Sequence, residues 1–544
     1  MNEKKPPQPR APRLFGDTLP GYSVWIIWAI TLIAIPLLRL YADDLDIAVV
    51  NGATMGLCVM SAVALWIWFV WFSASAVTPR RLAFLAALGG LIFLVTCVRI
   101  RDVDGALIPT FRFVWQPLAD RALAKPIVVE EPPAEANADA GPKEPDAVAF
   151  TGFLGPNRDA VIAGPKLARD WSAHPPAPIW KNKIGAGWAA FAAQDGRAVT
   201  LEQRGDDEWV TCYSVATGQT LWAHSVPTRH EEVMGGIGPR STPTIADGLV
   251  FTQGATGRVH CIDLATGKVV WTQNILELVG VDEAHAQQTV LWGRSGSPLV
   301  YQDLVIVPGG GPSADKCVSL FAFDKATGKE VWRGGDQQIS YSSPIVATFA
   351  GVQQIVIVNE STITGHDPAD GKQLWLYQWF GSSTANASTA QPHVMSGDRL
   401  FVSKGYGGGM RLVGIKREDD QWLAETLLEK TSVMKTKFTN VAILGDYAYA
   451  LSDGVLECVA WETGKAKWKK GRYGQGQILA VGDLLLVQCE SGEVALVEAN
   501  PDKFVELGKF QALEGKTWNN LCLYGSRLLV RNSDEAACYE LATE

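Results

Sequence analysis

The sequence Ala265-Thr-Gly-Lys-Val-Val-Trp271 is one copy of a short phrase that decides the fold. Its Gly supplies the positive φ of a tight turn, and its Trp lies in the alternating run that follows, so each copy predicts a hairpin between two strands. The other copies are Ala216-Thr-Gly-Gln-Thr-Leu-Trp222, Ala326-Thr-Gly-Lys-Glu-Val-Trp332, Ala369-Asp-Gly-Lys-Gln-Leu-Trp375 and Glu462-Thr-Gly-Lys-Ala-Lys-Trp468. Their spacing of about 40 to 60 residues, with one doubled gap, is the period of a propeller blade.

Each repeating unit reads as four short strands, as in residues 241–275. Such a unit cannot bury its own faces, so neighbouring sheets must stack radially, and the recurring Trp suits the gap between them. A degenerate unit, 386–430, fills the doubled gap, and two weak units follow at 475–510 and 517–544. The last unit ends after three strands. We expect residues 178–184, which include Trp180, to supply its fourth strand and close an all-β, eight-bladed propeller without an exposed sheet edge.

Three apolar runs precede the repeats, at residues 22–38, 48–72 and 82–98. Each approaches or exceeds the roughly 20 residues that cross a bilayer, and three runs in series do not fit a cleaved signal peptide. Most basic residues near the runs lie in the N-terminal tail and in the second loop, which carries Arg80 and Arg81; Arg39 lies at the edge of the first loop, and Arg99 and Arg101 follow the third run. Because Lys and Arg resist export, the tail is predicted to be cytoplasmic and the propeller periplasmic, in a multi-pass inner-membrane protein.

The predicted domains are a cytoplasmic tail at 1–20, a three-helix transmembrane anchor at 21–99, a juxtamembrane segment and linker at 100–148, and the propeller at 149–544. The linker proper, residues 122–146, is rich in Pro, Ala and acidic residues and cannot bury enough apolar surface to fold alone. The formal net charge is -9, and the large domain has no basic cluster. Nucleic acid is therefore not an expected partner, because phosphate binding requires concentrated Lys and Arg.

Four of the cysteines test the register of the repeat. Cys212, Cys261 and Cys458 each lie six positions before the turn Gly of their unit, and Cys538 has the matching place in the last unit. Residues in one register on different blades are too far apart to pair, so we interpret them as small buried strand residues rather than disulfides. No Cys-x-x-Cys-His or paired Cys-x-x-Cys motif occurs.

With these repeats, residues 149–544 resemble the family of propellers with pyrroloquinoline-quinone-type (PQQ-like) repeats. This family includes quinoprotein alcohol and glucose dehydrogenases and the outer-membrane assembly lipoprotein BamB. The phrase Phe153-Leu-Gly-Pro-Asn-Arg-Asp159 also resembles the start of a bacterial subgroup of membrane-anchored propeller repeat proteins. The resemblance implies the fold, but a shared fold does not establish a cofactor.

The residues just before the innermost strand of each blade are expected to converge around the mouth of the central channel. They mix aromatic planes, cations and amides, which suits a planar, anionic, carbonyl-rich ligand; alternatively, they only cap strands and order channel water. The candidate cofactor-binding residues are Trp188, Arg240, Trp292, Arg294, Tyr341, Asn386, Lys437, Asn440, Gln475, Trp518 and Asn519, with Ser241, Ser340 and Ser388 beside them.

The function that we predict is a membrane-anchored extracytoplasmic scaffold that binds a protein or another envelope ligand. The resemblance implies an alternative, a membrane dehydrogenase that oxidises an alcohol or sugar with pyrroloquinoline quinone and Ca²⁺. Such an enzyme needs hard oxygen ligands and an Asp base. The predicted ring contains no Asp or Glu, and the chain lacks the vicinal Cys-Cys pair of the soluble dehydrogenases, which favours the scaffold. No catalytic residue is assigned.

Two insertions contain possible metal ligands, His230-Glu-Glu232 and Glu283-Ala-His285. Neither offers a set of three ligands, so we interpret them as solvated loop residues and predict no metal site from them. The Gly-rich stretch 405–409 lacks the Lys-Ser/Thr of a phosphate-binding loop and is expected to let a blade turn tightly.

Overall fold

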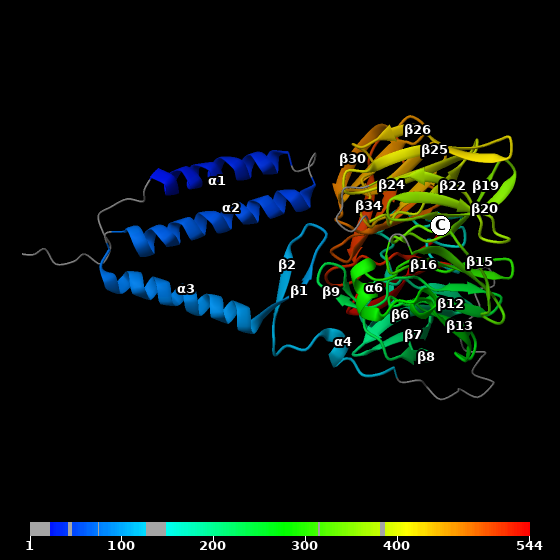
Figure 1. Cartoon of the computed structure of the whole chain (residues 1–544), viewed down its shortest axis with the longest axis horizontal. Coiled ribbons are helices and arrows are strands. Elements are labelled where there is room, and N and C mark those ends of the chain that lie inside the picture. Colours follow the sequence, from blue (N-terminus) through cyan, green and yellow to red (C-terminus); the bar gives the residue numbers. More distant parts are fainter. Residues whose placement is uncertain (1–21, 42–45, 74, 127–147, 314–315, 381–386) are drawn as a thin grey trace, which may run out of the picture. The chain divides into compact units, whose positions relative to one another are not determined.

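Figure 1 shows the computed structural model of the chain, which describes residues 22–41, 46–73, 75–126, 148–313, 316–380 and 387–544. The chain divides into two units, Met1–Pro117 and Leu118–Glu544. The first contains the apolar helices and the second contains the repeats. Most of the predicted linker and the candidate Asn386 lie outside the described residues.

Three helices form most of the first unit: α1 Tyr22–Leu40, α2 Ile47–Ile67, which continues into the π-helical turn η1 Trp68–Phe72, and α3 Val77–Cys97. Each of them is long and apolar enough to cross a membrane, as predicted. Asp46 caps α2 by accepting the Ala48 N–H at 2.9 Å, and Arg80 donates to the last carbonyls of η1. A hairpin of β1 Val98–Val103 and β2 Pro109–Phe113 follows.

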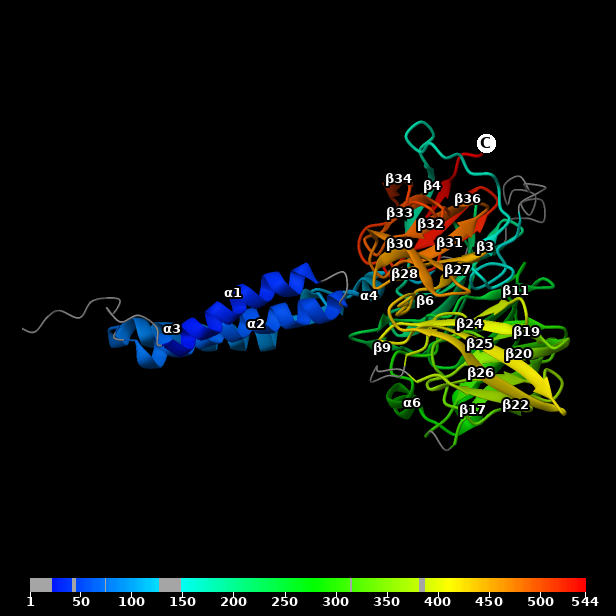
Figure 2. The same cartoon turned by 90° about the horizontal axis from the view of Figure 1, so that it is seen from above.

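The second unit is an eight-bladed propeller, which confirms the predicted fold. Each blade contains four antiparallel strands, which follow one another in chain order except in the last blade (Figures 1 and 2). Blade 1 is β5 Ala192–Gln194, β6 Arg197–Arg204, β7 Asp207–Ser214 and β8 Thr220–Val226; blade 2 is β11 Thr244–Ala246, β12 Leu249–Gln253, β13 Arg258–Asp263 and β14 Val269–Asn274; blade 3 is β15 Leu299–Tyr301, β16 Leu304–Gly310, β17 Val318–Asp324 and β18 Glu330–Gly334; blade 4 is β19 Ile345–Phe349, β20 Val352–Val358, β21 Thr362–His366 and β22 Gln373–Gln378. Blade 5 is β23 His393–Met395, β24 Arg399–Lys404, β25 Gly409–Glu418 and β26 Gln421–Lys430; blade 6 is β27 Val441–Leu444, β28 Tyr447–Ser452, β29 Val455–Ala460 and β30 Lys465–Arg472; blade 7 is β31 Gln477–Val481, β32 Leu484–Gln488, β33 Glu493–Glu498 and β34 Glu506–Gln511, with β3 Val161–Ile162 added parallel to β31; blade 8 is β35 Cys522–Tyr524, β36 Arg527–Arg531, β37 Glu535–Glu540 and β4 Ala177–Lys183.

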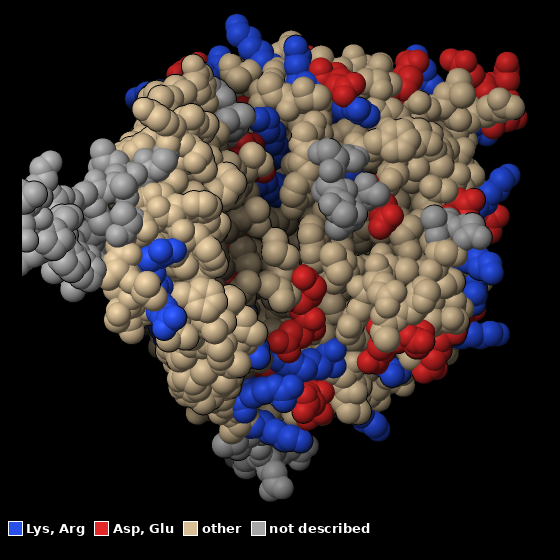
Figure 3. Space-filling view, turned by 60° about the vertical axis from the view of Figure 1, so that its left-hand side comes forward, with Lys and Arg blue, Asp and Glu red and all other residues tan. Residues whose placement is uncertain are grey.

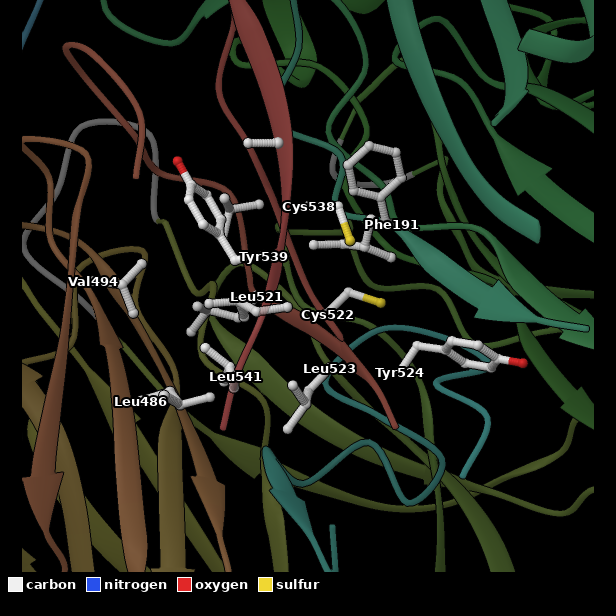
Figure 4. Packing of buried hydrophobic residues seen from close by; sticks show 14 of the residues in the cluster. Phe191, Leu486, Val494, Leu521, Cys522, Leu523, Tyr524, Cys538, Tyr539 and Leu541 are labelled. Atoms are coloured by element: carbon white, nitrogen blue, oxygen red, sulfur yellow. The ribbon is translucent and has the colours of Figure 1, made fainter. Parts of the chain in front are cut away.

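The ring closes through β4, which comes from the start of the domain and pairs antiparallel with β37 near its end. Cys538 lies opposite Trp180 in this pairing. The predicted closing strand is therefore confirmed, and blade 8 is held together by the two ends of the propeller sequence. Figure 4 shows the buried side chains around this closure, including Tyr539 and Leu541 from the C-terminal end of the chain and Phe191 from blade 1.

The antiparallel strands give the propeller two different faces. On the crossover face, the outer strand of each blade connects to the inner strand of the next, and the second strand turns into the third. On the hairpin face, the first strand turns into the second and the third into the fourth, so the Thr-Gly-Lys turns of the repeat lie there. Every inner strand therefore begins at the crossover face.

The repeated phrase forms a joint between blades. Trp222 of blade 1 donates its indole N–H to the Leu264 carbonyl of blade 2 at 2.8 Å, and its ring lies against Gly267 in the turn of blade 2. A Cβ on Gly267 would lie 2.5 Å from Cγ of Trp222. The Gly is thus required for the close approach of the Trp as well as for its φ of +73°. The same arrangement joins Trp180 to Gly218, Trp271 to Gly328 and Trp332 to Gly371.

The cysteines occupy the register that the repeat predicts. Cys212, Cys261 and Cys458 each lie directly opposite the Trp of their own blade, as Cys538 does in blade 8. All nine cysteines are free, and the seven in the propeller are buried. Figure 4 shows Cys522 and Cys538 among apolar side chains of blade 8. The prediction of small buried strand residues is confirmed.

Candidate functional site

Aromatic side chains gather where inner strands begin on the crossover face. Trp188 of blade 1 and Trp518 of blade 8 have ring centroids 4.9 Å apart, and Phe438 of blade 6 lies 4.6 Å from Trp518. The Lys516 ammonium lies 4.2 Å from the Trp518 ring and 5.1 Å from the Trp188 ring, in cation–π geometry. Residues from three blades therefore converge here, as the predicted topology requires.

A second aromatic pair lies on blades 3 and 4. The rings of Trp292 and Tyr341 are 5.2 Å apart, and the Tyr341 hydroxyl accepts the Trp292 backbone N–H at 3.3 Å. Burial raises the pKa of Tyr341 to about 12, so this hydroxyl is protonated at neutral pH. In both aromatic groups the rings contact each other directly, so a quinone ring has no room between the members of either pair.

The two aromatic groups are connected by the insertion between blades 1 and 2, which contains β9 Glu231–Glu232 and β10 Gly236–Ile237. Its Gly235 carbonyl accepts the Trp188 indole N–H at 2.6 Å and an N–H of Arg240 at 2.6 Å. Arg240 also donates to the carbonyls of Gly236 and Gly238. Burial lowers the pKa of Arg240 to about 10, still far above neutral pH, and its charge is spread over these carbonyls. Arg240 therefore holds this insertion in place.

The amide candidates tie neighbouring blades together. Asn440 Nδ2 donates to Gln477 Oε1 at 3.2 Å, and Asn519 Nδ2 donates to the carbonyls of Gly187 and Ala189 in blade 1. The Gln475 side-chain amide is buried and has no hydrogen-bond partner within the described part of the chain. Buried amides of this kind are commonly satisfied by ordered water, which fits the alternative that the ring orders channel water.

The side chains of Lys437 and Arg294 contact residues outside the two aromatic groups. The Lys437 ammonium lies 6.0 Å from the Tyr406 ring, and its backbone carbonyl accepts a hydrogen bond from Thr389. Arg294 is buried between the second-to-third-strand turns of blades 2 and 3, because Cβ atoms placed on Gly257 and Gly310 would lie within 3.3 Å of its guanidinium group. The serines link blades 4 and 5, since the Ser340 hydroxyl accepts the Ser388 N–H at 2.8 Å.

The opposite end of the channel is covered by the start of the propeller domain. Thr151 accepts a hydrogen bond from β11 of blade 2, Arg158 donates two to carbonyls just before β15 of blade 3, and Ala160 accepts one from β31 of blade 7. Blades 3 and 7 are opposite each other in a ring of eight, so residues 150–162 lie across the channel near its hairpin face. The Phe153 to Asp159 phrase thus has a structural role that its sequence did not reveal.

Buried charges on the crossover face were missed by the sequence analysis. Glu202 accepts hydrogen bonds from Arg204, Thr211 and Tyr213, and the neighbouring Arg531 helps to hold the pKa of this carboxyl below its usual value although burial opposes the shift. Burial raises the pKa of Glu208 to about 7. The sequence did contain a signal for these buried charges, because charged residues occupy positions of the alternating strands of blade 1 that face inward.

A short helix, α4 Ala119–Ala122, packs on the same face. The carboxylate of Asp120, 2% exposed, pairs with Arg229 at 2.6 Å, and Arg121 pairs with Asp206 at 2.8 Å. The Ala124 carbonyl accepts a hydrogen bond from Arg204 at 2.7 Å. The first residues of the predicted linker are therefore fixed on blade 1, while residues 127–147 lie outside the described part.

The two insertions with possible metal ligands have different surroundings from those expected. His230 is 2% exposed and lines a pocket with Glu283, so its prediction as a solvated loop residue is wrong. The reason is the insertion between blades 2 and 3, which folds over it. His285 is exposed, as predicted. Among the described residues, no three His, Cys, Asp or Glu side chains are grouped closely enough to hold a metal ion.

The Gly-rich stretch forms the turn between β24 and β25. Gly407 and Gly409 have positive φ, which confirms the predicted tight turn. On the face shown in Figure 3, Lys and Arg are interspersed with Asp and Glu rather than gathered in one basic field.

The comparisons with known proteins point to propellers of one type. The family profile described as outer membrane protein assembly factor BamB matches residues 206–470. A protein of Xanthomonas campestris pv. campestris named outer membrane protein assembly factor BamB is 32% identical over 147 residues, which are 27% of this chain and 32% of that protein. The dehydrogenase subunit of alcohol dehydrogenase (quinone) from Gluconacetobacter polyoxogenes is 29% identical over 125 residues, 22% of this chain and 16% of that protein. The matched segment thus spans less than a third of either relative.

Solved structures agree on the architecture. The quinohemoprotein alcohol dehydrogenase from Comamonas testosteroni superposes with a TM-score of 0.51 at 12% identity, covering 73% of this chain and 81% of that chain. At this identity the likeness shows the fold alone.

Proposed function

Because its propeller belongs to the family with PQQ-like repeats, we propose that this chain is a membrane-anchored scaffold that binds a protein or another envelope ligand outside the cytoplasm. The family contains both assembly factors and dehydrogenases, so the choice depends on the surface of this chain. In this proposal the three apolar helices hold the chain in the inner membrane and the propeller is periplasmic, as the basic tail and the Arg80 and Arg81 loop favour.

The observation that carries this proposal is a set of exposed apolar side chains on the crossover face. Val233 is 51% exposed, Met234 41% and Leu291 43%, and Phe380 is 65% exposed. They come from three separate crossovers, between blades 1 and 2, 2 and 3, and 4 and 5. Exposed apolar side chains that lie on one face of a protein are typical of surfaces that another protein covers. We call these four residues the apolar collar.

The proposal is tested by charging the collar without disturbing the fold. Val233→Asp places a carboxylate in the collar, whereas Val331→Asp places one at an equally exposed valine, 52% exposed, on the outer strand of blade 3. Partners of full-length protein are captured by crosslinking in intact cells and identified by quantitative mass spectrometry. We expect Val233→Asp to deplete specific partners at least about tenfold, since hot-spot contacts contribute about 2 kcal/mol or more, while Val331→Asp retains them. Equal recovery with both variants would contradict the proposal.

The dehydrogenase alternative is favoured by the aromatic groups around the channel mouth and by the similarity to alcohol dehydrogenase (quinone). Pyrroloquinoline quinone, with Ca²⁺, would supply the redox chemistry, and the ring residues Trp188, Trp292 and Trp518 would have to separate from their neighbours to admit it. Dye reduction by full-length protein with alcohols or sugars, added quinone and Ca²⁺ tests this alternative. If the wild-type protein reduces the dye and Trp292→Ala does not, the dehydrogenase function would replace the scaffold proposal.

A further inference from the structure

A two-stranded hairpin follows the third apolar helix without a break. The helix α3 ends at Cys97 and β1 begins at Val98, and β2 returns antiparallel beside β1 (Figure 1). The turn of the hairpin reaches the start of α2, where the Asn51 side chain donates a hydrogen bond to the Ala106 carbonyl at 2.8 Å. The hairpin therefore lies across the end of the helical unit at which α2 begins and α3 ends.

One face of this hairpin is apolar and exposed. Ile100 and Phe111 are directly opposite each other in the strand pairing, and they are 47% and 64% exposed. Phe113 lies on the same face, two residues further along β2, and its ring is stacked on that of Trp115 at 4.7 Å. A two-stranded hairpin is only marginally stable in water, so an exposed apolar face indicates that another surface covers it.

The apolar face is continuous with the exposed surface of α3. The Phe113 ring lies 6.3 Å from the ring of Phe93, which is in the last turns of that helix. The side chains around Phe93 are more than half exposed, as expected where lipid surrounds a helix: Leu91, Ile92, Leu94 and Val95. Aromatic side chains such as that of Trp115 concentrate at the boundary between lipid chains and headgroups. The surface that covers the apolar face is therefore the lipid around α3.

The opposite face of the hairpin carries two arginines. Arg99 and Arg112 are directly opposite each other in the strand pairing, which places their Cβ atoms about 5 Å apart. Both side chains donate to backbone carbonyls, and neither forms an ion pair within the described part of the chain. Like charges at such positions repel each other, so an anion that contacts both guanidinium groups would stabilise the hairpin.

The carboxylates of the hairpin are already engaged. Asp102 pairs with Arg101 at 3.5 Å, and Asp104 accepts two backbone N–H groups of the turn at 2.9 and 2.8 Å. The positive charges of Arg99 and Arg112 are thus left for a group outside the chain. A phosphate oxygen pair matches the planar fork of a guanidinium group.

We propose that the β1–β2 hairpin docks on the membrane surface and binds the headgroup phosphate of an anionic phospholipid with Arg99 and Arg112. An element with one apolar face lies at the boundary of lipid chains and headgroups, so the side chains of its other face reach the level of the phosphates. This inference rests on the membrane anchor of the proposed function and adds a lipid-binding surface to it.

Photocrosslinking of full-length protein in intact cells tests the apolar face. The photoreactive residue p-benzoylphenylalanine replaces Phe111 on the apolar face or, as a matched control, Thr110 on the opposite face of the same strand. Mass spectrometry identifies the products. We expect a phospholipid adduct at Phe111 and its loss at Thr110. An adduct with protein in place of lipid at Phe111, or equal lipid adducts at the two positions, would contradict the proposal.

A third position separates the hairpin from the anchor on which it rests. Leu94 is 57% exposed on α3, so Leu94→p-benzoylphenylalanine should form a lipid adduct whenever α3 spans the bilayer. A lipid adduct at Leu94 without one at Phe111 overturns the docking of the hairpin and leaves the anchor in place. Absence of lipid adducts at both positions overturns the anchor and the hairpin proposal together.

The arginine pair is tested by lipid selectivity. Full-length protein in detergent is mixed with phosphatidylglycerol or phosphatidylcholine of the same acyl chains, and bound lipids are counted by native mass spectrometry. We expect the wild type to retain one phosphatidylglycerol more tightly than phosphatidylcholine. Arg112→Gln should weaken the binding of that lipid about tenfold, as expected for loss of a hydrogen bond between charged groups. Arg101→Gln is the matched control and should retain it, because Arg101 already pairs with Asp102.

The stability of Arg112→Gln without lipid shows whether the arginine has a purely structural role. Since the substitution removes the repulsion from Arg99, the variant should unfold in detergent at the same or a higher temperature than the wild type. A lower unfolding temperature, or unchanged binding of phosphatidylglycerol, would rule out the proposed role of the pair.

Discussion

The joints between blades differ along the ring. Four consecutive joints, from blade 8 through blade 4, share one construction in which a Trp of one blade lies on the turn Gly of the next; we call this part the locked arc. Blade 5 lacks the phrase, so Trp375 of blade 4 instead donates to Gln354 in its own blade at 2.6 Å. On the other side of blade 5, the turn Gly464 of blade 6 lies against Lys430 rather than a Trp.

This difference shows what the phrase does. Its Gly and its Trp are only four positions apart in sequence but act in different joints, since the Gly receives the Trp of the preceding blade and the Trp contacts the Gly of the following one. Where one blade loses the phrase, both of its joints change. Blade 5 compensates with polar contacts to blade 4: Arg411 lies 4.9 Å from the Trp379 ring and donates to the Tyr377 hydroxyl, which also bonds Thr426 at 2.7 Å.

The largest effect is expected from filling a joint of the locked arc. Gly371→Ala adds a methyl inside the van der Waals envelope of the Trp332 ring, at a φ of +75°. Overpacking together with left-handed strain should lower the free energy of unfolding by about 4 kcal/mol. Urea unfolding of full-length protein in detergent, followed by tryptophan fluorescence, measures the change.

A matched control exists in the same blade. Gly351 has a φ of +77°, and a Cβ there has nothing within 4 Å. Gly351→Ala should therefore report the backbone strain alone, about 1 kcal/mol. If both substitutions cost the same, Trp332 does not define the joint and the distinction between the locked arc and blade 5 fails.

The two regions also contain buried groups, Glu208 and Lys404, whose shifted pKa values should give opposite responses to pH. Burial raises the pKa of Glu208 in blade 1 to about 7, and this carboxyl accepts the Ala255 N–H of blade 2 at 3.1 Å. Since the folded pKa exceeds the unfolded value of 4.5, the native state gains stability from the proton below about pH 4.5 and loses it as pH rises to about 7. Glu208→Gln should raise the free energy of unfolding at pH 8 by roughly 3 kcal/mol and have little effect at pH 4.5.

Lys404 of blade 5 should make stability change with pH in the opposite direction. Burial lowers its pKa from 10.5 to about 8, so the unfolded state binds more protons and wild-type stability should rise from about pH 8 to 10.5. Lys404→Met should remove that rise and leave the acidic window unchanged. Unfolding midpoints measured from pH 4.5 to 10.5 check both slopes, and a common slope in the two variants would contradict the assignment.

The interaction energy between the Gly and the Trp of one joint should be smaller than the cost of filling that joint, and it should be specific to that pair. Trp332→Leu removes the ring that Gly371 contacts, so Gly371→Ala in that background should cost only about as much as Gly351→Ala. The resulting interaction energy is about 2 to 3 kcal/mol in a double-mutant cycle. Trp222→Leu, two joints away, should be additive with Gly371→Ala. Coupling of equal size in both cycles would show that the joints are not independent.

The features predicted from sequence are those that repeat. The turn Gly, the Trp and the Cys opposite it recur at fixed offsets, so the blade count and even the closing strand with Trp180 could be derived from them. The role of Gly267 in receiving Trp222 could not, because that contact joins different blades and depends on how closely they stack. The path of residues 150–162 across the channel could not be derived either, because it depends on long-range contacts that do not repeat from blade to blade.

The site residues that could be predicted from sequence are those whose positions follow from the strand topology alone. Trp188, Trp518, Trp292 and Tyr341 meet near the inner strands because every inner strand starts at the same face. Whether a side chain is exposed or already occupied depends on the insertions between blades, and the sequences of these insertions have no periodic pattern. The loop around Gly235 occupies Arg240, and the helix α6 Glu283–Thr289 covers His230, so neither environment was visible in sequence.

The smallest effect should come from the contacts that replace the phrase at blade 5. Arg411 stacks on Trp379 and pairs with Glu429 at 2.7 Å, with a side chain 20% exposed. Arg411→Lys keeps the charge but loses the planar guanidinium that stacks on the Trp379 ring and donates to Glu429. It should lower the free energy of unfolding by about 1 kcal/mol. Arg417→Lys, at the end of the same strand, changes an exposed pair with Asp420 and a longer contact with the Trp422 ring, whose centroid is 5.6 Å away, and should cost less, about 0.5 kcal/mol or below. Equal costs at the two arginines would mean that the joint between blades 4 and 5 is held by its backbone and apolar contacts alone.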